Sequence, residues 1–199
     1  MRNAQLDTNT RTAYKDKRRY FWLSQPFLPL LPSISCWFGH VYDLPILYWS
    51  TALFWFALIA LLDESLPTDN NNPPEATLDE IELDRYYYQV LFASTPSYLA
   101  NITYVCWFAS NYDLSVIDYI GIGVSLGIVS GLGLAVGHEL GHKTSYLFRR
   151  AGKFLLGISG VPHFLVGHLN GHHRLVATPE DSSSSRMGES LYHFGFMRQ

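Results

Sequence analysis

Charged residues are missing from two long stretches of the chain, and this pattern sets the first expectation for its fold. Between residues 21 and 62 the only formal charge is Asp43, and between 86 and 137 there are only Asp113 and Asp118. A helix crosses a bilayer with about 20 predominantly apolar residues. The pattern therefore predicts two hairpins of membrane helices, the first from residues 28–41 and 44–62 and the second from residues 89–109 and 115–137.

These four segments predict an all-α fold, a polytopic bundle of membrane helices. The composition agrees with this prediction, because 48% of the residues are hydrophobic and only 16% are charged. Pro26, Pro29 and Pro32 lie in or beside the first segment, and proline disrupts helix interiors. We expect this first crossing to be kinked or to begin late.

Basic residues near the predicted crossings indicate their orientation. Those closest to the first crossing are Arg11, Lys15, Lys17, Arg18 and Arg19, and those closest to the end of the last one are Lys143, Arg149, Arg150 and Lys153. Lysine and arginine near membrane segments are retained on the cytoplasmic side. We therefore expect the N-terminus and residues 138–199 to be cytoplasmic. The acidic loop 63–85, with a turn or linker at Asn70 to Pro74, would lie there too, since acidic residues carry little topological weight.

Other features fit insertion as a multi-span protein. The first 20 residues are polar, which does not resemble a cleaved signal peptide. Cys36 and Cys106 fall inside predicted membrane segments without metal-site spacing, so we expect both to be packing residues. The lipid bilayer is the expected environment, and no nucleic-acid partner is expected.

The fourth predicted crossing is rich in glycine. Gly123, Gly127 and Gly131 are four residues apart, and Gly133 and Gly137 repeat that spacing. Rows of small residues let membrane helices approach closely, so a packing face is favoured over a ligand path. The helix is also expected to continue through residues 138–147, because nothing after Gly141 breaks it.

Histidines cluster after this crossing, in GHELGHK at 137–143 and in HLNGHH at 168–173. His138 and His142 are four residues apart, so on a helix they differ by about 40° and about 6 Å and can meet one metal ion. His168 and His172 repeat this spacing. On a helix His173 would project about 100° further round, toward a different point and a second metal. Imidazole suits zinc, copper, nickel and iron alike.

Two alternatives accompany this prediction of a metal site. GHELGHK also fits the zinc-protease pattern H-E-x-x-H, in which Glu139 would activate water. A catalytic zinc uses about three protein ligands, whereas five clustered histidines favour iron, and two ions. The isolated His40 and His193 are expected to be ordinary polar residues, and His163 to be either a ligand or a partner of one.

The segments NNPPE with RYYYQVL at about 71–91, GHELGHK, and HLNGHHRLVATPEDSSSSRMGES at 168–190 together resemble the membrane-bound alkane hydroxylase (alkane 1-monooxygenase) family. That family belongs to the histidine-rich di-iron membrane oxygenases, which also include xylene monooxygenases and, more distantly, fatty acid desaturases. The resemblance implies six membrane helices with a non-heme di-iron site at their cytoplasmic ends. By position, its ligands would include His138, His142, His168, His172 and His173, with Glu139 as a residue beside them.

The resemblance also implies an activity. It implies O2-dependent terminal hydroxylation of medium- or long-chain n-alkanes to primary alcohols, in the bacterial inner membrane. Electrons would come from rubredoxin and an NADH-dependent rubredoxin reductase. An alkane has no polar handle, so an apolar cavity must position it. Trp55 resembles a channel-facing position of the family, and Leu58, Ile59 and Leu62 lie on nearby turns. A lipid-facing or packing role for Trp55 is an equal alternative.

Two departures from the family pattern are visible. The family usually has a glutamate before the histidine that matches His168 and an asparagine after it, where this chain has Gly167 and Leu169. The family's later motifs, NYxEHYG and H-x-x-HH, do not occur. We therefore expect residues 1–199 to be the N-terminal part of one alkane hydroxylase domain, a C-terminally truncated fragment that is inactive alone. A xylene-type oxygenase, a desaturase, a zinc intramembrane protease and a metal-binding protein without activity remain the alternatives.

Overall fold

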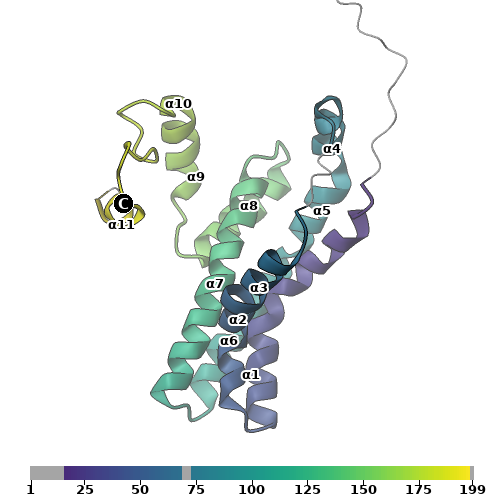
Figure 1. The fold of residues 1–199 in the computed structure, drawn as a ribbon, viewed down its shortest axis with the longest axis vertical. Helices are drawn as coiled ribbons and strands as arrows, with labels where there is room; N and C mark the ends of the chain where they lie inside the picture. The colour runs from purple at the N-terminus through teal and green to yellow at the C-terminus, as the bar shows by residue number, and fades with distance from the viewer. Residues whose placement is uncertain (1–15, 69–72, 198–199) are drawn as a thin grey trace, which may run out of the picture.

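The computed structural model describes residues 16–68 and 73–197, and every regular element within these ranges is helical. Long helices lie side by side in a bundle, and the C-terminal segments extend from one end of it (Figure 1). The predicted all-α fold is confirmed. The linker at Asn70 to Asn72 and two of the basic residues, Arg11 and Lys15, lie outside the described residues.

The first hairpin consists of two helical rods. One comprises η1 (Arg19–Leu30) and α1 (Leu31–Val41), and the other comprises η2 (Pro45–Trp49), α2 (Ser50–Leu53), η3 (Phe54–Leu58) and α3 (Ile59–Ser65). The first rod begins at Arg19, earlier than the expected residue 28. Pro26 and Pro29 lie in its 3-10 portion, and Pro32 lies in the first turn of α1. Pro32 costs little in that position, because the first N–H groups of a helix have no partner within it. Pro26 and Pro29 lie inside η1, and the α-helix itself begins only at Leu31, later than residue 28 as expected.

The second hairpin follows two short elements, η4 (Glu75–Thr77) and α4 (Leu78–Leu83). Its first rod comprises α5 (Arg85–Ala93) and α6 (Thr95–Asn111), and its second is α7 (Val116–Gly141). Ser115 and Asp118 form a capping box at the start of α7, which satisfies two free backbone donors. An ion pair between Arg19 and Asp84 joins the start of η1 to the start of α5.

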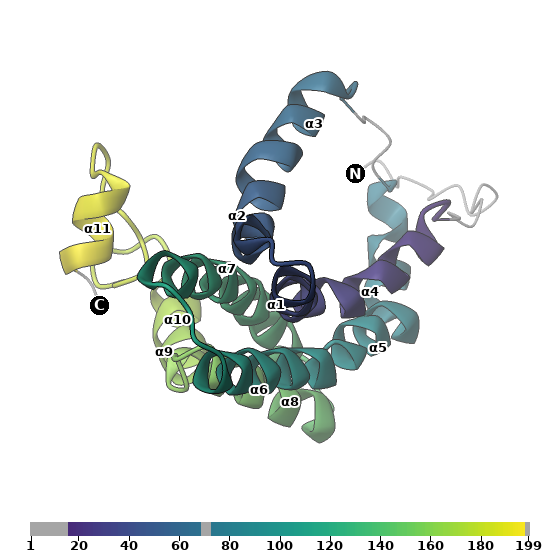
Figure 2. The same cartoon turned by 90° about the horizontal axis from the view of Figure 1, so that it is seen from below.

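Two of the four predicted crossings are helices long and apolar enough to cross a bilayer. These are Pro45–Ser65 and Val116–Gly141. The turns of both hairpins lie at the lower end of the bundle in Figure 1, whereas the end of α7 and the C-terminal segments lie toward the other end. In the view from below, the rod that ends in α3 diverges from the other helices (Figure 2).

Two clusters of buried side chains hold the rods together. One joins α6, α7 and the helix that follows α7, and includes Tyr98 and Val129. The other joins the two hairpins, and includes Cys36 and Phe108. Cys36 is a packing residue as expected, but Cys106 is exposed, so the same prediction for Cys106 is wrong. Cys106 lies on the outer face of α6.

A polar contact also joins the hairpins. Asn101 is 1% exposed, and its Oδ1 accepts hydrogen bonds from the N–H of Ser33 at 3.1 Å and from the Ser33 hydroxyl at 2.6 Å. Interhelical hydrogen bonds of this kind stabilise helix association in membranes. Asn101 thus fixes the position of α6 against α1.

The helix that carries the first histidine motif ends earlier than expected. α7 stops at Gly141, and α8 (Tyr146–Ile158) packs back along it. The expectation of a continuous helix through residue 147 is therefore wrong. α8 is amphipathic, and its Leu155 and Leu156 become fully buried only because it returns onto the bundle. That burial favours the reversal of the chain.

The glycines of α7 divide into two groups. A Cβ atom on Gly152 of α8 would lie 2.6 Å from the carbonyl oxygen of Gly137, so the two helices touch through their backbones there. Gly133 also packs closely, against Tyr98. By contrast, no described residue lies within 4 Å of a Cβ atom placed on Gly123, Gly127 or Gly131. The predicted packing role is confirmed for Gly133 and Gly137, whereas the other three glycines pack against nothing in the described part of the chain.

Candidate metal site

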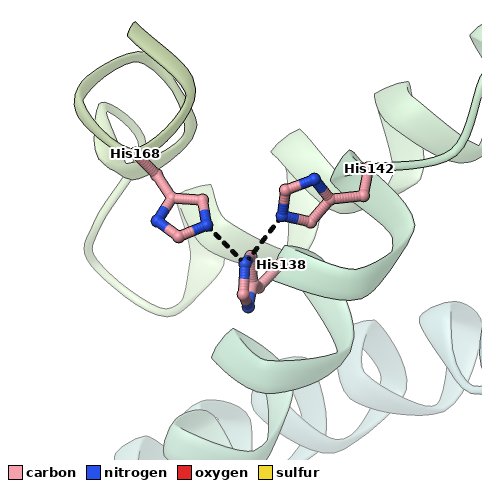
Figure 3. A group of neighbouring side chains, drawn as sticks. All are labelled: His138, His142 and His168. Atoms are coloured by element: carbon pink, nitrogen blue, oxygen red, sulfur yellow. Dashed lines mark hydrogen bonds between the residues drawn. The ribbon is translucent and has the colours of Figure 1, made fainter. Parts of the chain in front are cut away.

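Three imidazoles from two separate segments meet at the end of α7. His138 and His142 lie on the last turn of α7 and just after it, and His168 begins η5 (His168–His172), which follows α9 (Phe164–Gly167). The Nε2 atom of His138 lies 2.7 Å from Nε2 of His168 and 2.8 Å from Nε2 of His142. Figure 3 shows the three rings pointing toward one another. One potential ligand atom from each ring lies within 4.8 Å of those of the others.

These separations are close to those of ligands that share one ion. Two nitrogens that bind an ion at about 2.0–2.1 Å lie about 2.8–3.4 Å apart, for angles between 90° and the tetrahedral value. To hold a metal, the two contacts of His138 would lengthen by only a few tenths of an ångström, and the rings of His142 and His168, whose ligand atoms lie within 4.8 Å, would move toward each other. The donor set is nitrogen alone, which suits iron, zinc, copper or nickel.

His173 joins this cluster through an unusual turn. η5 is a π-helix, in which the N–H of His173 donates to the carbonyl of His168 five residues earlier. The wider turn places Nε2 of His173 3.0 Å from Nε2 of His168. The expectation that His173 points toward a different site is therefore wrong. π-helical turns are rare and frequently lie at functional sites.

His172 turns instead toward Asp181, which sequence reasoning missed. Its Nδ1 lies 2.8 Å from Oδ2 of Asp181, a carboxylate that is 1% exposed. The Ser184 hydroxyl and the N–H of Ser183 donate to the same carboxylate. Ser184, then Ser183 and His172, hold the pKa of Asp181 below its ordinary value. The only signal in the sequence was an acid nine residues after a histidine, too common a pattern to single it out.

The charge state of the cluster suits metal binding. Burial lowers the pKa of His168 to about 4, and the neighbouring imidazoles of His138 and His173 act in the same direction. A ring with this pKa is neutral at pH 7, and only neutral imidazole binds a metal. His142 and His173 are exposed, so the cluster opens to one side.

Other candidate residues lie outside the cluster. Glu139 is half exposed and pairs with Lys143 at 2.7 Å. His163 is exposed at the start of α9, where no contact with the clustered rings is found among the described residues. His193 pairs with Glu189, and the ring of His40 packs 4.1 Å from that of Tyr112.

The proposed substrate wall lies on the diverging rod. Trp55 is half-buried in η3, and its indole N–H is buried without a partner in the described part of the chain. Leu58 and Leu62 are each 45% exposed, and Ile59 is half-buried. The Ser125 hydroxyl of α7 donates to the carbonyl of Tyr48 at 2.8 Å. Trp55 lies seven residues after Tyr48 on this rod, which diverges from the other helices toward α3 (Figure 2).

Comparison with known proteins gives consistent matches. The alkane 1-monooxygenase of Pseudomonas putida is 38% identical over 181 residues, covering 91% of this chain and 45% of the relative. The alkane 1-monooxygenase of Acinetobacter baylyi is 33% identical and covers 90% of this chain and 45% of the relative. The xylene/toluene monooxygenase hydroxylase component of Pseudomonas putida is 36% identical over 75 residues, covering 37% of this chain and 20% of the relative. No protein-family model matches the chain. The chain spans less than half the length of the alkane 1-monooxygenases named here.

Proposed function

We propose that this chain, which belongs to the alkane 1-monooxygenase family, takes part in terminal hydroxylation of n-alkanes within the complete protein. The similarity to that family extends over 91% of the chain. The observation that carries this proposal is the convergence of His138, His142, His168 and His173 at the end of an apolar helix. The substrate is a medium- or long-chain n-alkane, and the product is a primary alcohol. Residues 1–199 then form the N-terminal part of a single domain with six membrane helices.

The clustered histidines are proposed to hold non-heme iron, two ions in the complete site. His138, His142 and His168, whose ligand atoms lie within 4.8 Å of one another, would hold one ion, and His173 and His172 would supply further ligands to the pair. Asp181 holds a proton on Nδ1 of His172 and fixes the direction of that ring, as carboxylates beside metal-bound histidines do. Iron, when bound, supplies the one-electron chemistry that dioxygen requires.

Electrons and protons must also reach the site. Inserting one oxygen atom into a C–H bond and reducing the other to water takes two electrons and two protons. Rubredoxin, with its NADH-dependent reductase, is the proposed electron source. The proposed orientation in the bacterial inner membrane places the exposed His142 and His173 on the cytoplasmic side, where a soluble electron donor can approach them.

The alkane is proposed to enter from the bilayer along α7. Gly131 and His138 are seven residues apart, so they differ by only about 20° around the helix. The open row of Gly123, Gly127 and Gly131 therefore runs along the same face toward the metal. A face without side chains leaves space for a hydrocarbon chain. The rod with Trp55, Leu58, Ile59 and Leu62 meets α7 at Ser125, about 120–200° around the helix from these glycines, and is proposed as a separate apolar wall of the substrate path. Shape alone positions a substrate that has no polar group.

The test uses the full-length membrane protein that contains this segment. Metal analysis is combined with oxidation of octane and hexadecane in the presence of rubredoxin, its reductase and NADH. We expect about two irons and a primary alcohol, and the loss of both in His138→Ala. His193→Ala is the matched control, because its ring lies outside the cluster and pairs with Glu189. Stoichiometric zinc with peptide cleavage, or full activity in His138→Ala, would contradict the proposal.

A further inference from the structure

A pocket opens between α8 and the segment that carries the second histidine motif. Its volume is about 270 Å³. Arg149, Arg150 and Lys153 of α8 line one side, and Leu165, Val166 and Leu169 line the other. One wall is therefore cationic and the other is apolar.

The three cations are available to a ligand. None of them pairs with a carboxylate in the part of the chain that the structure describes. The carboxylate of the nearby Glu139 is paired with Lys143 instead. Arg149 and Lys153 are four residues apart and share a face of α8. The guanidinium of Arg150 lies 4.7 Å from the ring centroid of Tyr146, which leaves its edge free to donate hydrogen bonds. Arginine in this setting favours a phosphate.

The pocket lies at the level where a membrane helix ends. Gly141, the last residue of the candidate span Val116–Gly141, lines it. Tyr146 is 65% exposed beside it and Val166 is 62% exposed, and tyrosine is enriched at membrane interfaces. Basic pockets at the cytoplasmic ends of membrane helices bind anionic lipid head groups. A ligand with a phosphate and an acyl chain matches the two walls better than a soluble anion does.

We propose that this pocket binds the head group of an anionic phospholipid, with the first carbons of an acyl chain against Val166 and Leu169. The inference rests on the proposed membrane orientation. It has a consequence for the metal site, because Leu169 and Asn170 both line the pocket and belong to η5. A bound lipid would hold the turn that carries His168 and His172 against α8.

The experiment measures lipid retention on the full-length protein. Nanodiscs of phosphatidylcholine alone are compared with nanodiscs that also contain phosphatidylglycerol, and retained lipid is counted by native mass spectrometry after transfer to detergent. We expect phosphatidylglycerol to be retained in preference. Arg149→Gln/Lys153→Gln should weaken that retention about tenfold or more, since each basic residue near an anionic surface adds to binding. The reverse exchange Arg149→Lys/Lys153→Arg, which keeps both charges, should retain most of it.

The matched control is Lys17→Gln/Arg85→Gln, which removes two exposed charges outside the pocket. Equal retention of both lipids, or an equal loss in this control, would overturn the proposal. Displacement of the lipid by inorganic phosphate, or preferential capture of an acidic electron-donor protein in detergent, would also overturn it. His138→Ala should retain phosphatidylglycerol normally, so failure of the lipid site is distinguishable from failure of the proposed function.

Discussion

Nδ1 of His172 lies 2.8 Å from Oδ2 of Asp181, and this contact joins the second histidine motif to the segment that follows it. The carboxylate is buried and receives further hydrogen bonds from Ser183 and Ser184. It is therefore held in place by its own neighbours, and it can hold the imidazole in turn. The free nitrogen of His172 is then Nε2.

Asp181→Asn should weaken metal binding without unfolding the protein. The amide can still accept a hydrogen bond from Nδ1, but it lacks the charge that increases the basicity of the ring. Losses of about 10- to 100-fold in metal affinity are typical for such partners. Iron affinity is measured by competition with a chelator on the full-length protein. Asp113→Asn, an exposed change in the turn before α7, is the control, and equal affinities for the two variants would argue against a positioning role.

Gly152→Ala should destabilise the contact between α8 and α7. A Cβ atom there would lie 2.6 Å from the carbonyl oxygen of Gly137, so the helices must separate. Overpacking of this kind costs about 1–3 kcal/mol. Thermal unfolding in detergent checks the prediction. Gly157→Ala is the control in the same helix, because no described residue would meet its Cβ atom. It should stabilise the protein by about 0.5–1 kcal/mol. A loss of stability in Gly157→Ala would contradict the packing of α8 described above.

Gly167→Glu should be accommodated and should strengthen metal binding. Gly167 has helical angles, φ −65° and ψ −39°, and no described atom lies within 4 Å of a Cβ atom placed there. Replacing a helical glycine gains about 0.5–1 kcal/mol, and the glutamate adds a negative charge one residue before His168. Gly167→Gln isolates the effect of charge. We expect both variants to melt at a higher temperature and only Gly167→Glu to increase iron affinity. A lower melting temperature in both variants would show that residue 167 has no room for a side chain.

Trp55→Ser should extend the accepted alkane chain in the full-length enzyme. Removing the indole opens the apolar wall that Trp55 is proposed to form with Leu58, Ile59 and Leu62. Phe56→Ser is the matched control, because Phe56 is 74% exposed on the adjacent position. The product profile from a mixture of alkanes checks this by gas chromatography. An unchanged profile in Trp55→Ser would remove this residue from the substrate path.

The sequence predicted the helical hairpins because their apolar runs are long and nearly free of charge. It also predicted that histidines from two segments approach one another, since i, i+4 spacing places both rings of a pair on one face. In the structure, two successive contacts of 2.7 and 3.0 Å link His138 through His168 to His173. For the first rod, the prolines correctly predicted that the α-helix starts late, at Leu31, but not that a 3-10 helix would precede it from Arg19.

Other features depend on contacts that spacing does not reveal. α7 ends at Gly141 because α8 folds back and buries Leu155 and Leu156 against the bundle. That burial depends on residues about 15 positions later in the sequence, which the pattern around Gly141 does not reveal. The exchange of roles between His172 and His173 follows from a π-turn, for which a helical pitch of 3.6 residues gives the wrong answer. Asp181 becomes recognisable only once the chain has folded back on His172.

The π-turn of η5 makes the length of one short segment more important than its chemistry. Its additional residue brings His173, rather than His172, beside His168. Deleting a single position such as Asn170 would give His168 and His173 the spacing of an ordinary α-turn, in which both rings still share a face. Inserting one residue would instead move His173 about 100° further round and out of the cluster. Substitutions at the same position change no register. Between His168 and His173 the chain should therefore accept many exchanges of side chain, and the loss of one residue better than the gain of one.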